Sequence, residues 1–284
     1  MGQIATVIGL GLIGGSLALA LKKYTDLTVV GYDNCQQTRE LAEQNGTLDQ
    51  IADSLEASVA QADIIFFAVP PGEIGALVLQ VAKHIKAGAI VTDVASTKGQ
   101  LLSVVPSLLP PDVQYVGGHP MAGSEKTGFT AAKAELFNGR PYIVTRHQGI
   151  CENALVYLST IAARIGALPV IIEGQQHDPA VAHISHMPYV AATALTVLAG
   201  QGAQGPLHLA LAAGGFRDMT RIASSNPGLW ADICLTNKDE IQKTIGQLKE
   251  LLDGIGSKLV GEDREGLIEF FQQAKQFRDA YQSS

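Results

Sequence analysis

Short apolar runs alternate with helical stretches along the first part of the chain. Residues 4–8 form a β-branched run typical of a buried parallel strand, and residues 15–24 continue with helical composition. The same alternation recurs as far as Glu173, which predicts a doubly wound α/β domain over residues 1–173. Its other predicted strands are 27–32, 63–69, 89–93, 114–116, 141–145 and 168–172, with helices at 73–85, 98–108 and 151–165.

The pattern changes after Glu173, where the predicted sheet closes. Helical periodicity without a convincing strand covers residues 178–200, 207–220, 229–253 and 264–281, with turn-forming segments between them. We therefore expect an all-α C-terminal domain over residues 174–284. Several of its helices have apolar faces and few charges, so we expect a homodimer that buries them.

A glycine-rich turn joins the first strand to the first helix. Gly9, Gly11 and Gly14 give the spacing GxGxxG, with Leu12 and Ile13 at the start of the helix. Gly9 permits the tight turn, Gly11 lets the backbone approach a pyrophosphate, and Gly14 allows the helix to pack closely on the strand. Free N–H groups at the helix N-terminus attract the same anion. The motif predicts a Rossmann dinucleotide-binding domain.

Two further segments belong to this predicted cofactor site. Asp33 ends the second strand, nineteen residues past Gly14, where its carboxylate accepts hydrogen bonds from ribose hydroxyls and repels a 2′-phosphate. This favours NAD over NADP. Val69 and Pro70 end another strand and are expected to border the cofactor. The alternative is a glycine-rich turn with Asp33 as a solvated loop acid.

Composition excludes several classes of partner and location for this protein. A net charge of −7 argues against nucleic acid, whose phosphates require cationic contacts. The three cysteines are far apart and lack metal or redox spacing, which favours reduced thiols in the cytoplasm. Residues 4–21 are apolar enough to suggest a membrane span, but four glycines interrupt them, so we expect no membrane association.

His119 is the first candidate for chemistry, because it lies just past the predicted strand 114–116 in the sequence GGHPMAG. Ligands of open α/β sheets gather at the carboxyl ends of strands, and imidazole exchanges a proton near neutral pH. Ser96 and Lys98 follow another strand and face the same crevice. Ser96 alternatively caps the next helix.

The helical domain offers further candidates. His177, His183 and His186 open it, but no metal-binding motif accompanies them, so core or capping roles are the default and no metal is expected. Arg217 has the planar fork that suits a carboxylate, although a terminal arginine also complements a helix dipole. The residues alone leave these alternatives open.

The motifs GLGLIGGS, DVASTK, GGHPMAGSEKTG, HISHMPY and GFRDMTRIA occur in order along most of the chain. Together they closely resemble the prephenate/arogenate dehydrogenases of tyrosine biosynthesis. The resemblance implies NAD-dependent oxidative decarboxylation of prephenate to 4-hydroxyphenylpyruvate by a homodimer. It also implies that His119 accepts the proton of the ring hydroxyl and that Ser96 orients the reacting groups. His186 and Arg217 are then expected to bind substrate, and Lys98 and Glu125 to line the cleft.

Alternatives remain beside this resemblance. Arogenate differs from prephenate only in a side-chain amino group, which the sequence does not discriminate. A dehydrogenase of the β-hydroxyacid or imine-reducing type would share the cofactor domain, and an NAD-sensing dimer would retain it without turnover. The last predicted helix ends close to Ser284, so we expect no regulatory domain, and any inhibition by tyrosine is expected at the active site.

Overall fold

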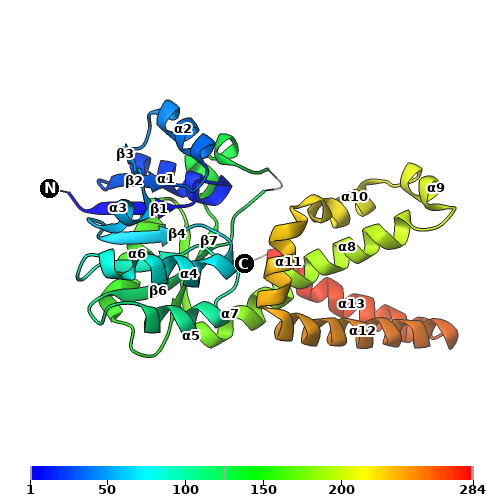
Figure 1. Ribbon diagram of the computed structural model, residues 1–284. Coiled ribbons are helices and arrows are strands. Elements are labelled where there is room, and N and C mark those ends of the chain that lie inside the picture. Colours follow the sequence, from blue (N-terminus) through cyan, green and yellow to red (C-terminus); the bar gives the residue numbers. More distant parts are fainter. Residues whose placement is uncertain (1, 125, 283–284) are drawn as a thin grey trace. The chain divides into compact units, whose positions relative to one another are not determined.

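The computed structural model describes residues 2–124 and 126–282 (Figure 1). The chain divides into two compact units, one ending at Lys238 and the other beginning at Asp239. The first unit contains an eight-stranded sheet in the order β3-β2-β1-β4-β5-β6-β7-β8. The strands are β1 Ile4–Ile8, β2 Thr28–Tyr32, β3 Gln50–Ile51, β4 Ile64–Phe67, β5 Ile90–Asp93, β6 Gln114–Pro120, β7 Pro141–Arg146 and β8 Leu168–Glu173.

Helices connect these strands and continue beyond them. In the sheet region they are α1 Leu12–Tyr24, α2 Gln36–Asn45, α3 Leu55–Val59, α4 Pro71–Val81, α5 Gly99–Leu108 and α6 Glu152–Arg164. Those that follow are α7 Gly174–Val181, the π-helix η4 Ala182–His186, α8 Met187–Gly200, α9 Gly205–Ala210, α10 Gly214–Thr220 and α11 Pro227–Thr236. The last two are α12 Lys238–Val260 and α13 Arg264–Gln282. The expected boundary between the sheet domain and the helical domain, at residues 173 and 174, stays a prediction.

Two apolar clusters hold the sheet domain together, one on each face of the sheet. Leu17 of α1 and Leu155 of α6 belong to the cluster that contains Phe66, whereas Ile74 of α4 belongs to the cluster that contains Phe67. Phe66 and Phe67 are adjacent in β4, and successive strand side chains point to opposite faces. Helices on both faces bury this sheet, which explains its nearly continuous apolar strands.

The order of the strands reverses direction between β1 and β4. β1 pairs in parallel with β2 on one side and with β4 on the other. The loops at their carboxyl ends therefore diverge, and this opening is where an open α/β sheet binds its ligand. The Gly-rich turn after β1 lies at this opening.

β6 is longer than the sequence predicted. It pairs in parallel with β5 through Val116 and then antiparallel with β7 from Gly117 to Pro120, so His119 lies within the strand rather than past its end. Gly118 makes this extension possible, because a Cβ there would lie 2.6 Å from the carbonyl oxygen of Asp93 and 2.9 Å from the hydroxyl of Tyr142. The backbone of β6 can therefore approach its neighbours closely.

Several other elements differ from the pattern. The predicted helix 178–200 begins earlier, at Gly174, and contains the π-helical segment η4. The predicted helix 229–253 is two helices, α11 and α12, which meet at Asn237. The pattern of apolar positions did not predict α2, β3 and α3, which are short. In α2 only Ala42 is buried, so its apolar periodicity is weak.

Candidate active site

The Gly-rich turn has the geometry that the motif predicts. Gly9 has a φ of +91°, and a Cβ there would overlap the carbonyl oxygen of Ala68. Gly14 packs so closely that a Cβ would overlap the carbonyl oxygen of Gly9. Gly11 differs from both, since a Cβ there would meet no atom within 4 Å. Gly9 and Gly14 thus shape the turn, and Gly11 leaves room for a ligand against the backbone.

A cavity of about 250 Å³ opens beside this turn at the carboxyl ends of β1, β2 and β4. Leu12 and Ile13 form the first turn of α1 next to it, where helix N–H groups are available to an anion. Gly14 follows them in α1 and packs against the carbonyl oxygen of Gly9. The residues that line the cavity include the predicted Gly9, Gly11, Asp33, Val69 and Pro70, together with Tyr32, Asn34 and Glu73.

Asp33 also holds the turn in place. One of its carboxylate oxygens accepts a hydrogen bond from the backbone N–H of Leu10 at 2.7 Å, and the other accepts from the backbone N–H of Cys35 at 2.9 Å. Its carboxylate therefore links the Gly-rich turn to the end of β2 while bordering the cavity. A carboxylate at this position suits an unmodified ribose, whose hydroxyls can donate hydrogen bonds to it.

His119 belongs to a buried chain of hydrogen bonds. Its Nδ1 lies 2.9 Å from Nε2 of His177, and Nδ1 of His177 lies 2.6 Å from a carboxylate oxygen of Asp178. Asp178 also accepts hydrogen bonds from the backbone N–H groups of Lys98 and Gly99, both at 2.8 Å. The chain thus connects β6, α7 and the start of α5. The Nε2 of His119 has no hydrogen-bond partner in the described part of the protein.

Burial sets the charge of these rings. It lowers the pKa of His119 well below its usual value, and the charge of Lys98 acts in the same direction. Burial likewise lowers the pKa of His177, although Asp178 opposes this. Both rings are therefore neutral near pH 7, and neutral imidazole is the form that accepts a proton.

His186 faces the same region from η4. Its ring is fully buried, Nδ1 lies 3.1 Å from the side-chain amide nitrogen of Asn237, and Nε2 has no partner among the described residues. Burial lowers the pKa of His186 to about 4, against the charge of Asp178 and the nearby backbone of Ser96. A buried polar atom without a partner is costly, so this Nε2 is suited to a ligand.

Two aromatic rings, those of Trp230 and Tyr189, pack beside His186. The ring of Trp230 stacks on that of Tyr189 at 3.7 Å between centroids, and it meets the His186 ring edge-on at 6.1 Å. Trp230 therefore packs between Tyr189 and His186 and restrains the orientation of the His186 ring.

Lys98 does not reach the cleft. Its side chain is fully buried and its Nζ donates to a carboxylate oxygen of Asp93 and to the carbonyl oxygen of Ala95, both at 2.7 Å. The hydroxyl of Tyr115 donates to the other carboxylate oxygen of Asp93 at 2.6 Å. This paired arrangement gives Lys98 a structural role beneath the site, and the expectation that it lines the cleft is corrected on that ground.

The other predicted residues lie as follows. Ser96 is half-buried in the loop between β5 and α5, whose backbone approaches His186. Arg217 is exposed in α10, and its guanidinium has no carboxylate partner among the described residues. Glu125 lies outside the described residues. The structure thus brings Ser96 and His186 together, and Arg217 remains available to an anionic ligand.

Three residues of this site owe their place to tertiary contacts: the sequence left His177 with a core or capping role and did not single out Asp178 or Asn237. His177, Asp178 and Asn237 each bond to a group far away in the chain, as His177 does with His119 across 58 positions. The only local signal was the adjacent polar pair His177 and Asp178 near the start of an otherwise apolar helical run.

Comparison with known proteins places this site in a family. A model of the prephenate dehydrogenase nucleotide-binding domain matches residues 17–171, and a model of the prephenate dehydrogenase dimerization domain matches residues 173–273. The chain belongs to the prephenate dehydrogenase family. The prephenate dehydrogenase of Bacillus subtilis (strain 168) is 38% identical to it over 274 residues, which cover 95% of this chain and 74% of that relative.

Solved structures of this family have the same fold. The prephenate dehydrogenase of A. aeolicus, in complex with hydroxyphenyl propionate and NAD+, is 28% identical, with a TM-score of 0.90 and 99% of both chains covered. Synechocystis arogenate dehydrogenase is 29% identical, with a TM-score of 0.86 over 98% of this chain and all of that chain. These matches confirm the predicted family, the fold class, and an enzyme that uses NAD.

Proposed function

We propose that this chain catalyses the oxidative decarboxylation of prephenate to 4-hydroxyphenylpyruvate with NAD. The observation that carries the proposal is His119, a buried neutral imidazole whose Nδ1 is engaged and whose Nε2 has no partner in the described residues. A ring held in this way accepts a proton from a substrate hydroxyl. Family membership and the cavity beside the Gly-rich turn support the same reaction.

NAD, when bound, supplies the acceptor for the hydride that leaves the hydroxyl-bearing carbon. Gly9, Gly11 and the first turn of α1 would hold its pyrophosphate, and Asp33 would accept hydrogen bonds from its ribose. Val69 and Pro70 would border it at the end of β4. The open space at Gly11 supports this fit.

The protein's own groups act on the substrate. His119 takes the hydroxyl proton on Nε2, while the ring carboxylate leaves as CO₂ and the ring becomes aromatic. Ser96 orients the hydroxyl. His186 donates through Nε2, because its Nδ1 accepts from the side-chain amide of Asn237 and the neutral ring therefore carries its proton on Nε2. Arg217 binds a carboxylate of the substrate, since its planar fork matches that group. Holding the reacting groups in one geometry supplies much of the rate enhancement.

Arogenate is the second candidate substrate, because the Synechocystis arogenate dehydrogenase covers nearly the whole chain. The two substrates differ in one side-chain group, keto or amino. Steady-state kcat/KM for both, each with NAD and with NADP, decides between them. We expect the highest value for prephenate with NAD, and a higher value for arogenate would reverse the assignment.

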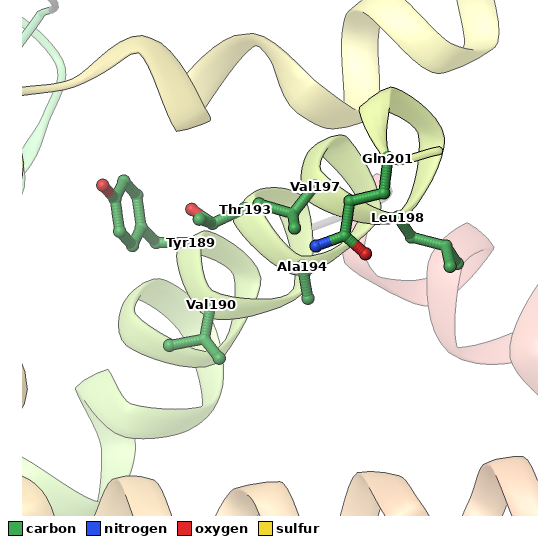
Figure 2. Close-up of a pocket in the computed structure, with 7 residues that line it drawn as sticks. All are labelled: Tyr189, Val190, Thr193, Ala194, Val197, Leu198 and Gln201. Carbon is green, nitrogen blue, oxygen red and sulfur yellow. The ribbon is translucent and has the colours of Figure 1, made fainter. Parts of the chain in front are cut away.

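We also propose that the protein is a homodimer through its helical part. The family's dimerization domain supports this, as does an apolar groove along α8 with a volume of about 440 Å³ (Figure 2). Leu198 at one end of the groove is 71% exposed. Seven residues line the groove: Tyr189, Val190, Thr193, Ala194, Val197, Leu198 and Gln201.

The same apolar face explains a feature that otherwise suggests a membrane. In the described part of the chain, the helical run Gly174–Gly200 is long and apolar enough to span one, with a mean hydropathy of 1.2. However, its first turns carry His177 and Asp178 into the site, and it lies within the matched dimerization domain. We assign the face to subunit contact, and we propose a cytoplasmic location from the free cysteines Cys35, Cys151 and Cys234.

A further inference from the structure

His177 is buried against His119 and bonds to the largely buried Asp178, and neither residue has a place in the mechanism above. The His177 side chain has no exposed surface, and that of Asp178 is 13% exposed. Water therefore has little access to replace their hydrogen bonds, and a buried polar group that loses its partner is destabilised. This chain of hydrogen bonds therefore has one defined arrangement of protons, which follows from the charge of Asp178.

Asp178 is the fixed end of the chain. Although burial opposes ionisation, the hydrogen bonds from His177 and from the backbone N–H groups of Gly99 and Lys98 lower the pKa of Asp178. Its carboxylate is therefore ionised near neutral pH, and an ionised carboxylate only accepts hydrogen bonds. The backbone donors cannot reverse their direction, because an N–H group has no acceptor function.

The ionised carboxylate of Asp178 determines which ring nitrogens of His177 and His119 carry protons. Nδ1 of His177 must carry a proton, because it lies 2.6 Å from an oxygen that only accepts. Since the ring is neutral, its Nε2 bears a lone pair and accepts from Nδ1 of His119 at 2.9 Å. Nδ1 of His119 is then the protonated nitrogen, and the lone pair of that neutral ring lies on Nε2.

We propose that His177 and Asp178 are a positioning pair that fixes the tautomer of His119, so that its Nε2 presents a lone pair to the substrate hydroxyl. The proposal rests on the function proposed above for His119. His177 touches neither substrate nor cofactor in it; it acts only through His119. Without His177, the His119 ring would be free to carry its proton on Nε2, and that form cannot accept the hydroxyl proton.

The charged and titratable groups around the pair are consistent with this arrangement. Lys98 at the start of α5 and Asp93 in β5 are paired with each other at 2.7 Å, which leaves neither to compete for His177. His186 in η4 bonds to Asn237 through Nδ1. Asp178 is thus the one carboxylate in the described residues that bonds directly to this pair of rings.

A spectroscopic experiment tests the arrangement without relying on turnover. Long-range ¹H–¹⁵N correlation spectra of the full protein labelled with ¹⁵N-histidine report which ring nitrogen carries the proton, and the His119→Asn variant assigns one set of signals. We expect His119 protonated on Nδ1 and unprotonated on Nε2, with the same pattern for His177. A proton on Nε2 of His119 would overturn the proposal.

Kinetics of two variants test its consequence. In His177→Leu the acceptor is lost, so we expect kcat to fall by about 10² to 10⁴-fold, as when a catalytic histidine loses its orienting partner. In His177→Gln an amide oxygen still accepts from His119, so kcat is expected within about tenfold of wild type. NAD affinity should be unchanged in both. His183→Gln, which changes an exposed histidine of η4, is the matched control.

The outcomes separate this proposal from the proposed function. Equal losses in the Leu and Gln variants, or full activity in His177→Leu, would contradict the positioning role even though prephenate is turned over. If the wild type does not turn over prephenate, the proposed function fails, and the spectra still decide the tautomer. If His177→Leu does not fold, the wild-type spectra and the Gln variant remain as tests.

Discussion

At the scale of single residues, His119 is buried and has one ring nitrogen, Nε2, without a hydrogen-bond partner in the described part of the chain. Burial lowers its pKa, so the ring stays neutral and ready to accept a proton at neutral pH. We predict that His119→Asn lowers kcat by about 10² to 10⁴-fold, the usual contribution of an acid–base group, while the Kd of NAD is unchanged. The control is His84→Asn, at an exposed position in the sheet domain. Wild-type turnover by His119→Asn would reject this residue as the base.

Asp33 has two tasks, and a pair of variants tests whether its charge selects the cofactor. Its carboxylate holds the N–H of Leu10 and borders the cofactor cavity with a negative charge. Asp33→Asn retains an oxygen for Leu10 but removes the charge that repels a 2′-phosphate. We expect it, like Asp33→Ala, to lower the ratio of kcat/KM for NAD over NADP by about tenfold or more. An unaltered ratio in both variants would show that Asp33 does not read the ribose.

The sequence made some of these residues predictable and left others hidden. Gly9, Gly11 and Asp33 follow from a spacing along one strand, turn and strand, and the structure places them at one cavity. His177 and Lys98 depend instead on tertiary contacts. Lys98 was expected in the cleft, but its burial is stable only because Asp93 lies 2.7 Å away, and no local pattern reveals that pairing.

At the scale of elements, the close contact of α1 with β1 depends on Gly14. A Cβ at this position would overlap the carbonyl oxygen of Gly9, which is backbone and cannot rotate away. We predict that Gly14→Ala lowers the free energy of unfolding by about 2 kcal/mol or more in chemical denaturation. Gly75→Ala in α4 is the control, because its Cβ would meet only a side-chain carbon at 3.8 Å. Equal stability of the two variants would contradict this account of the turn.

The helices and strands differ in how well the apolar pattern of the sequence predicts them. The strand Ile4–Ile8 and the helix Arg264–Gln282 were predicted to within a residue or so at each end. The strand is a short continuous apolar run, and the helix has strong apolar periodicity. The extension of β6 to Pro120 was not predicted. It requires the antiparallel partner β7, which lies more than twenty residues further along the chain. Short polar elements such as α2 lack the periodicity that marks a buried face.

At the scale of the whole molecule, the proposed dimer has a direct test. Leu198 is 71% exposed beside the groove of α8 shown in Figure 2. A carboxylate there would be desolvated in a subunit interface, so we predict that Leu198→Asp weakens the dimer by about tenfold or more in Kd. Leu79→Asp changes a similarly exposed leucine of α4 in the sheet domain and serves as the control. A monomeric wild type in sedimentation would refute the dimer.

The reaction itself provides the most direct test of the central claim. Purified protein should be incubated with prephenate and NAD, and NADH, CO₂ and 4-hydroxyphenylpyruvate should be quantified together. We predict that the three products form in equal amounts and that none forms when either reactant is omitted. The account would be contradicted if prephenate stayed unchanged while the protein still bound NAD, or if NADH formed without release of CO₂.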